Sequence, residues 1–234
     1  MRLNLFVIAT LLCAARGQAQ VGHPPESTPY RDILYGSSLT PFVGHIGGNG
    51  GKLGIGPHDG WTYGGRFDYR LSNVISVGLS FESGTMDRLI VDADDPVASR
   101  VKGPVSQQLS MLEAALQMNI TGKKTWHGLA PFVGGTIGLA WAPATRADTS
   151  GYKFGSHVVL APNLGFRFFA GQRLHVRADV RQVFWHLKYP SSYLLEPADD
   201  PPASGAPSNA VLAGQKLDQW TGGTEFRLGV GFSF

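Results

Sequence analysis

Cysteine is almost absent from this chain of 234 residues, with Cys13 as its only example. Because Cys13 lies in an apolar N-terminal stretch, the rest of the chain cannot form a disulfide scaffold or a cysteine-ligated metal site. The seven histidines are scattered, with no pair at metal-ligand spacing. The acidic groups in residues 92–95 and 199–200 are expected to be solvated loop residues rather than a calcium site. We therefore expect no metal and no cofactor.

Long apolar runs and a strong charge are also missing. Beyond residue 19 no apolar run reaches the roughly 20 residues that a membrane-spanning helix needs, and no helical periodicity is seen. Charged residues make up 16% of the chain. Removing Arg2 and Arg16 with the N-terminal stretch leaves 18 basic and 17 acidic residues, a formal charge of +1. This near-balance argues against nucleic acid as a partner.

The N-terminus has the pattern of a secretory signal peptide. Arg2 gives a basic start, residues 3–15 are mostly apolar, and small residues precede a cleavage point after Ala19. The apolar run is too short for a transmembrane helix and contains Asn4. We predict a signal peptide over residues 1–19, an irregular periplasmic N-terminal segment over 20–37 and an outer-membrane β-barrel domain over 38–234.

Glycine and alternating apolar residues are abundant. The chain contains 31 glycines, and its last nine residues place Phe226, Leu228, Val230, Phe232 and Phe234 on one face of a strand. Period-two alternation bounded by turn residues predicts eight strands. They span residues 38–46, 61–70, 74–88, 105–121, 129–141, 154–170, 173–188 and 216–234.

Short and long connections alternate between these strands. Residues 71–73, 122–128 and 171–172 form short turns, whereas residues 47–60, 89–104, 142–153 and 189–215 form long loops. Short turns at one end and long loops at the other are typical of outer-membrane barrels, with the turns in the periplasm and the loops outside. The sequence therefore predicts an all-β fold, an eight-stranded antiparallel up-and-down transmembrane β-barrel.

Charged residues share the strand phase opposite to the apolar row. They mix both signs in near-equal number, which favours a lumen of paired ions. A soluble barrel of lipocalin type would bury the apolar row instead, and it is the structural alternative. We predict a structural charge network in the lumen formed by Arg66, Asp68, Arg70, Glu82, Glu113, Arg167, His175, Arg177, Asp179, Arg181, Glu225 and Arg227.

Eight strands enclose only enough space for side chains, so this network predicts a plugged, salt-bridged lumen rather than a pore. Pro162 falls inside the sixth strand and requires a bulge or a shortened strand. Residues 183–185 are consecutively apolar, so this end of the seventh strand is expected to rise above the bilayer. Interfacial aromatic girdles are predicted from Trp61, Tyr63, Tyr69, Trp126, Trp141, Trp185, Tyr189 and Trp220.

Two segments repeat one pattern, Leu39-Thr-Pro-Phe-Val-Gly44 and Leu129-Ala-Pro-Phe-Val-Gly134. With these segments, the turn at residues 70–73 and the ending at 228–234, the chain resembles the small outer-membrane β-barrel proteins of OmpA/OmpX type. The resemblance implies location in the cell outer membrane of a Gram-negative bacterium. It also implies that Phe232 and Phe234 are an assembly signal for the barrel-assembly machinery. We expect a monomer whose other partners are outer-membrane lipid and lipopolysaccharide.

Recognition on a rigid scaffold concentrates in loops, so we expect a structural or surface-interaction role through the long extracellular loops. Some barrels of this type modify lipid A with a histidine, a serine two residues on and a nearby acid. Here His175 is followed by Arg177 and His186 by Lys188, so we expect no enzyme. The alternatives are an OmpW-like passive channel for small apolar molecules and a lipid A-modifying outer-membrane enzyme.

Overall fold

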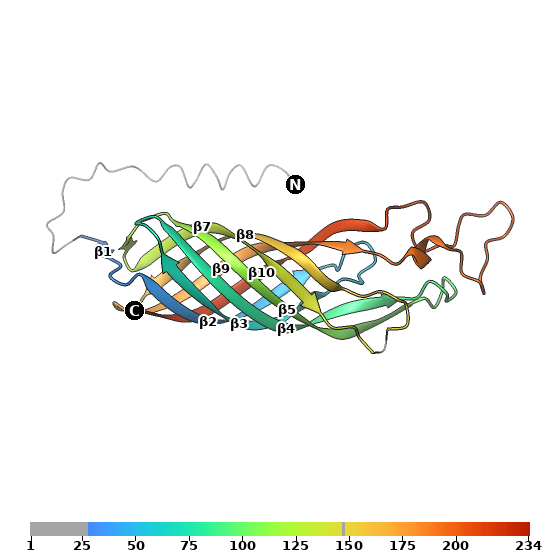
Figure 1. Ribbon diagram of the computed structural model, residues 1–234, viewed down its shortest axis with the longest axis horizontal. Coiled ribbons are helices and arrows are strands. Elements are labelled where there is room, and N and C mark those ends of the chain that lie inside the picture. The colour runs from blue at the N-terminus through green and yellow to red at the C-terminus, as the bar shows by residue number, and fades with distance from the viewer. Residues whose placement is uncertain (1–27, 147) are drawn as a thin grey trace.

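The computed structural model describes residues 28–146 and 148–234, so the predicted signal peptide lies outside the described residues. Eight long antiparallel strands close into one barrel, as predicted (Figure 1). They are β2 (Ser37–Gly48), β3 (His58–Arg70), β4 (Ile75–Val91), β5 (Val101–Asn119), β7 (Leu129–Ala142), β8 (Gly155–Phe169), β9 (Leu174–Lys188) and β10 (Asp218–Ser233). In the described part of the chain no helix is long and apolar enough to cross a bilayer.

Two short strands and one helical turn complete the described elements. Strand β1 (Tyr30–Asp32) pairs with β6 (Lys124–Trp126), and the 3-10 turn η1 (Ser191–Leu194) lies in the loop between β9 and β10. The segment 20–37 is therefore not wholly irregular, and the prediction is wrong for β1. Backbone pairing to the β5–β7 turn gives these residues a ladder despite their neighbouring proline.

The register of the barrel is staggered by ten residues. Partners can be followed from Phe232 of β10 through Leu39, Phe67, Leu79, Ala114, Ile137, Leu160 and Phe184. The path returns to β10 at Gly222, ten residues from its start. A closed sheet must be staggered in this way because its strands tilt relative to the barrel axis. The stagger decides which inward side chains meet across the interior.

Pro162 lies within β8 without a bulge. The β8–β9 ladder pairs Leu160 with Phe184 and resumes at Asn163 and Arg181 in the same register. Proline lacks an N–H and so removes a ladder bond, but its backbone remains extended. The prediction of a bulge or a shortened strand is therefore wrong, and the consequence is a local gap in the hydrogen bonds between β8 and β9.

Six of the eight aromatic residues predicted for interfacial girdles point away from the barrel. Trp61 and Trp220 are 68% and 60% exposed near the long-loop end. Trp185 and Tyr189 are buried instead, with Trp185 only 1% exposed, so the girdle prediction is wrong for these two residues. They share the strand phase of Arg181, which faces inward, and strict period-two counting places all three on the same side.

Candidate functional site

Three glutamates and two arginines form a central cluster inside the barrel, defined by Glu82, Glu113, Glu225, Arg181 and Arg227. The side chain of Arg181 is 0% exposed and forms ion pairs with all three glutamates. Its Nη1 atom lies 2.5 Å from Glu113 Oε2. Arg227 Nη2 lies 2.6 Å from Glu82 Oε1, and Arg227 Nε lies 3.2 Å from Glu225 Oε1. Because four strands, β4, β5, β9 and β10, supply these groups, the cluster ties distant parts of the sheet together.

Neutral groups complete the coordination of the glutamates. The hydroxyl of Thr62 donates to Glu225 Oε1 at 3.0 Å, and that of Thr136 donates to Glu113 Oε1 at 2.7 Å. A Cβ atom at Gly44 would lie only 2.6 Å from Glu225 Oε1. Glycine is therefore needed where β2 passes the cluster, since a larger residue would displace the carboxylate.

A second set of charges lies toward the short turns. This turn-end cluster consists of Arg66, Asp68, Arg167, Arg177 and Asp179. Arg66 Nη2 lies 2.7 Å from Asp68 Oδ1, Arg177 Nε lies 2.9 Å from Asp179 Oδ1, and Arg177 Nη1 lies 3.6 Å from Asp68 Oδ2. Paired in this way, the two aspartates offset two of the three arginines. The cluster is left with one excess positive charge.

The repeated segment on β2 and β7 contributes aromatic rings to the interior. Phe42 and Phe132 are buried and lie in the inward phase, although the predicted lumenal set did not include them. The guanidinium of Arg227 lies 4.6 Å from the ring centre of Phe42, and that of Arg177 lies 4.1 Å from the ring centre of Phe132. Each ring therefore supports an arginine through a cation–π contact.

The two clusters contain ten of the twelve residues predicted for the charge network, and Arg70 and His175 lie outside them. Arg70 is half-buried at the turn end, where its Nη1 donates to the carbonyl of Ile33 at 2.9 Å. His175 is buried, with its ring nitrogens 3.4 Å from the hydroxyls of Thr40 and Ser233. Both residues face the interior, but neither forms an ion pair among the described residues.

The two terminal phenylalanines predicted as an assembly signal point outward from β10. Phe232 and Phe234 are both exposed, and the ring of Phe234 lies 6.5 Å from that of Phe67. Their side chains lie on the apolar outer face rather than in the interior.

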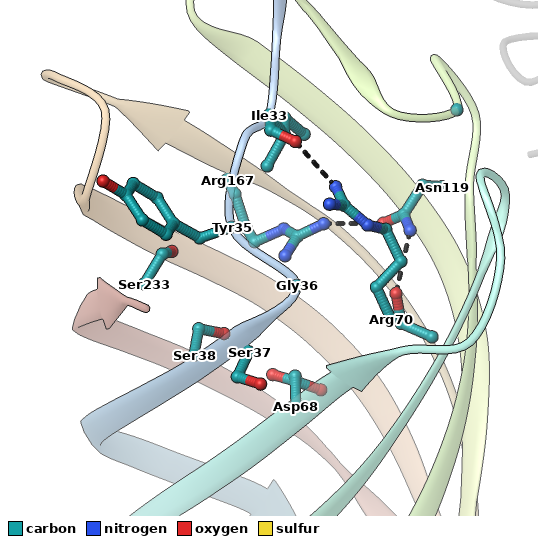
Figure 2. A pocket seen from close by; sticks show the side chains of 12 residues that line it. Ile33, Tyr35, Gly36, Ser37, Ser38, Asp68, Arg70, Asn119, Arg167 and Ser233 are labelled. Carbon is teal, nitrogen blue, oxygen red and sulfur yellow. Dashed lines mark hydrogen bonds between the residues drawn. The ribbon is translucent and has the colours of Figure 1, made fainter.

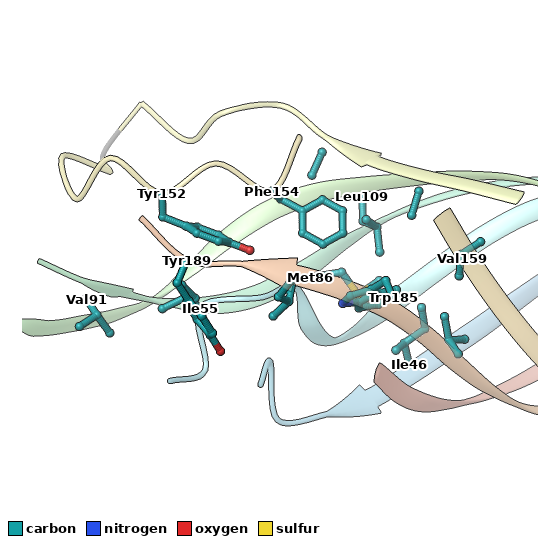
Figure 3. Packing of buried hydrophobic residues seen from close by; sticks show 14 of the residues in the cluster. Ile46, Ile55, Met86, Val91, Leu109, Tyr152, Phe154, Val159, Trp185 and Tyr189 are labelled. Atoms are coloured by element: carbon teal, nitrogen blue, oxygen red, sulfur yellow. The ribbon is translucent and has the colours of Figure 1, made fainter. Parts of the chain in front are cut away.

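The interior changes character toward the long loops, where buried apolar side chains pack into one cluster, the apolar cap (Figure 3). Within this cap the ring of Phe154 meets that of Trp185 edge-on, with ring centres 5.8 Å apart. The η1 residue Tyr193 is fully buried, and its hydroxyl donates to the carbonyl of Val91 at 2.7 Å. The cap also includes Ile46, Ile55, Met86, Leu109, Met111, Val159, Val183, Leu187, Tyr189 and Leu212.

One buried ion pair fixes a long loop onto this cap. Arg88 of β4 pairs with Asp148 of the β7–β8 loop, and its guanidinium lies 5.4 Å from the ring centre of Tyr152. Burial raises the pKa of Asp148, but hydrogen bonds from Ser150 and the charge of Arg88 outweigh it and hold that pKa below its ordinary value. Arg88 shares the strand phase of Glu82, so its inward direction was readable from the sequence. Its partner Asp148 lies in a loop, where the sequence gives no such periodicity.

The acidic segments at residues 92–95 and 199–200 contact other groups of the loops. Among residues 28–146 and 148–234, no group of three or more histidine or acidic side chains is placed to hold a metal ion. Asp95 pairs with Lys102 at 2.6 Å, and the backbone N–H of Val97 donates to Asp200 Oδ2 at 3.2 Å. The two Asp-Asp-Pro segments therefore touch and link the second and fourth long loops.

Comparison with known proteins shows the fold. No protein-family model matches the chain, and no curated protein matches it. The outer membrane protein OprG from Pseudomonas aeruginosa superposes with a TM-score of 0.53 at 12% identity, over 89% of this chain and 99% of OprG. Neisserial surface protein A and the N-terminal β-barrel domain of P. aeruginosa OprF give TM-scores of 0.48 and 0.45. Neisserial surface protein A is 11% identical over 85% of this chain, and the OprF domain is 14% identical over 84% of it. The match covers 97% of each of the two structures.

The fold and the polarity of its two faces together define the class of protein. The chain is an eight-stranded β-barrel of the kind found in outer-membrane proteins, with an apolar outer face and a charged interior. A lipocalin-type soluble barrel would bury its apolar row, and here that row faces outward. Leu228 and Val230, for example, are exposed, whereas Arg227, which precedes Leu228 on β10 and points to the opposite face, is buried.

Proposed function

We propose that this protein is a structural or surface-interaction barrel of a Gram-negative outer membrane, with a lumen that does not conduct. The single observation that carries the proposal is the filled interior. The central and turn-end clusters occupy the inward face of the lower barrel, and the apolar cap closes the part next to the long loops. A pore would need a continuous path past both layers, and an eight-stranded barrel has no spare width for one.

The long loops are the part that offers contact with other molecules. The loop between β9 and β10 contains exposed Leu194 and Leu195, followed by a segment rich in proline and alanine (Figure 1). Apolar residues held at the tip of a rigid scaffold are suited to recognition. The proposal includes a monomer surrounded by membrane lipid and lipopolysaccharide, with no catalytic activity.

Two measurements test this proposal in order. First, the detergent-extracted mature protein is compared on gels with and without heating, and a mobility shift is expected for a folded membrane barrel. Second, the protein is reconstituted in planar bilayers beside a general porin as a positive control. We expect no conductance steps from this protein, and regular steps would contradict a closed lumen. Unchanged lipid A mass profiles in cells that express it would support the absence of catalysis.

A passive lateral channel is the second candidate because of the ladder gap at Pro162. Where β8 and β9 lose hydrogen bonds, a small apolar molecule could pass sideways between the two strands, and it would need no path through the interior. Vesicles containing the protein are assayed for uptake of a small apolar dye, with Pro162→Val as the matched variant. Faster uptake by the wild type than by Pro162→Val favours this candidate, whereas equal uptake favours the closed barrel.

A further inference from the structure

Two arginines at the turn end lack a carboxylate partner. No described carboxylate oxygen lies within ion-pairing distance of Arg70 or Arg167. Arg70 donates to the carbonyl of Ile33, and Arg167 Nη2 donates to Asn119 Oδ1 at 2.7 Å, so both are held by neutral acceptors. Arg167 is buried, and among the described residues no atom accepts a hydrogen bond from its Nε. A buried charge is costly unless an opposite charge compensates it.

Both side chains line one small cavity at the mouth of the barrel (Figure 2). Its volume is about 10 Å³, which is room for a single guest of the size of a water molecule. The lining also includes Asp68, whose carboxylate is already paired with Arg66 and Arg177. The remaining charge at this cavity is therefore positive.

Hydroxyl groups add neutral donors to the same cavity. Ser76 Oγ accepts a hydrogen bond from Asn119 Nδ2 at 3.0 Å, so its own proton is available to donate elsewhere. Ser38 also lines the cavity and is buried. A small site that combines guanidinium and hydroxyl donors is suited to an anion and offers little to a cation.

The segment before β2 covers the mouth. Ile33 is buried, its N–H donates to the carbonyl of Lys123 at 2.7 Å, and Ser37 N–H donates to the carbonyl of Phe234 at 3.2 Å. Figure 2 shows residues 33–36 passing across the mouth close to Arg70 and Arg167. The segment therefore separates the cavity from the space beyond the turns, which strengthens the interaction of a guest with the two arginines.

We propose that the turn-end cavity binds one monatomic halide ion, chloride under ordinary conditions, between Arg167 and Arg70. Chloride is close in size to the single guest that the cavity admits, whereas sulfate and phosphate carry four oxygens and need more room. The bound anion supplies the charge that the protein itself does not place beside Arg167. Halide binding then stabilises the folded barrel, because the unfolded chain has no such site.

Thermal unfolding of the mature protein in detergent tests the proposal. The midpoint of the heat-modifiable gel shift is measured in sodium chloride, bromide and sulfate at matched ionic strength. We expect the midpoint to rise with the logarithm of chloride or bromide concentration, each tenfold step above the dissociation constant being worth about 1.4 kcal/mol. Arg167→Gln should lose this dependence. Arg31→Gln should keep it, because Arg31 is exposed at the same end and does not line the cavity.

Equal effects of chloride and sulfate on the wild type would overturn the proposal, as would an unchanged halide response in Arg167→Gln. If Arg167→Gln does not fold, crystals of the wild type grown in sodium bromide decide the question. An anomalous bromine peak within hydrogen-bonding distance of Arg167 Nε supports the site. A map with no bromine at the mouth refutes it.

Discussion

Replacing Arg181 with methionine is the sharpest perturbation of the central cluster. Methionine is unbranched and fills irregular space, so the substitution removes charge with a modest change in packing. Arg181 forms ion pairs with Glu82, Glu113 and Glu225, as Arg227 also does, and its side chain is 0% exposed. After the change, three buried carboxylates share Arg227 alone, and the cluster carries two uncompensated negative charges instead of one.

The expected loss of unfolding free energy is about 3–5 kcal/mol, the cost of removing one partner from a buried ion pair. The measurement is a urea titration of the protein folded into lipid vesicles, followed by gel mobility and tryptophan fluorescence. Arg31→Met serves as the control, because substitution of this exposed arginine should change stability by no more than about 0.5 kcal/mol.

A double-mutant cycle separates lost charge from lost packing. Glu113→Gln removes one of the carboxylates that Arg181 holds. If the ion pair is what matters, the double variant loses less stability than the two single variants added together. A loss below about 1 kcal/mol for Arg181→Met, or strict additivity in the cycle, would refute the view that charge pairing holds the interior together.

Three further outcomes follow from the interior and the loops. Fluorescence of Trp185 should resist quenching by brominated lipid, whereas Trp141, which lies beside Phe81 on the outer face, should be quenched, as single-tryptophan variants would show. Asp148→Asn should expose its loop to trypsin at neutral pH. In the wild type the loop should stay protected from proteolysis down to about pH 4. This protection should be lost only as the pH falls through the lowered pKa of Asp148. Among outward residues of β4, Asp87→Cys should react with a water-soluble maleimide and Phe81→Cys, which a bilayer would cover, should not; equal labelling would contradict a bilayer edge between these two residues.

The strands and the inward set of charges could be predicted because period-two alternation is a local property. Predicted and observed strand ends agree to within four residues, since turn residues mark them. The pairing inside the barrel could not be predicted in this way. Which carboxylate meets Arg181 depends on the ten-residue stagger, and only closure of the whole sheet sets that stagger.

The errors also have physical causes. Trp185 was assigned to the outside because aromatic residues favour interfaces, although its phase matches that of Arg181. The type of residue was given more weight there than its position along the strand. Asp148 lies in a loop, where no periodicity indicates direction, so its pairing with Arg88 required the folded structure.

The consecutive apolar residues of β9 mark a reversal of polarity along a strand whose phase is constant. Below residue 182 the inward side chains are charged, as at Arg177, and the outward ones are apolar, as at Val180. Above it the inward side chains are apolar, as at Leu187, and beyond the exposed Phe184 the outward ones are polar, as at Lys188. A wall in contact with acyl chains needs an apolar outside, while a wall in water needs an apolar inside. For the proposed membrane barrel, the reversal indicates where β9 leaves the bilayer, and beyond that level the apolar cap is stabilised as the core of a soluble protein would be.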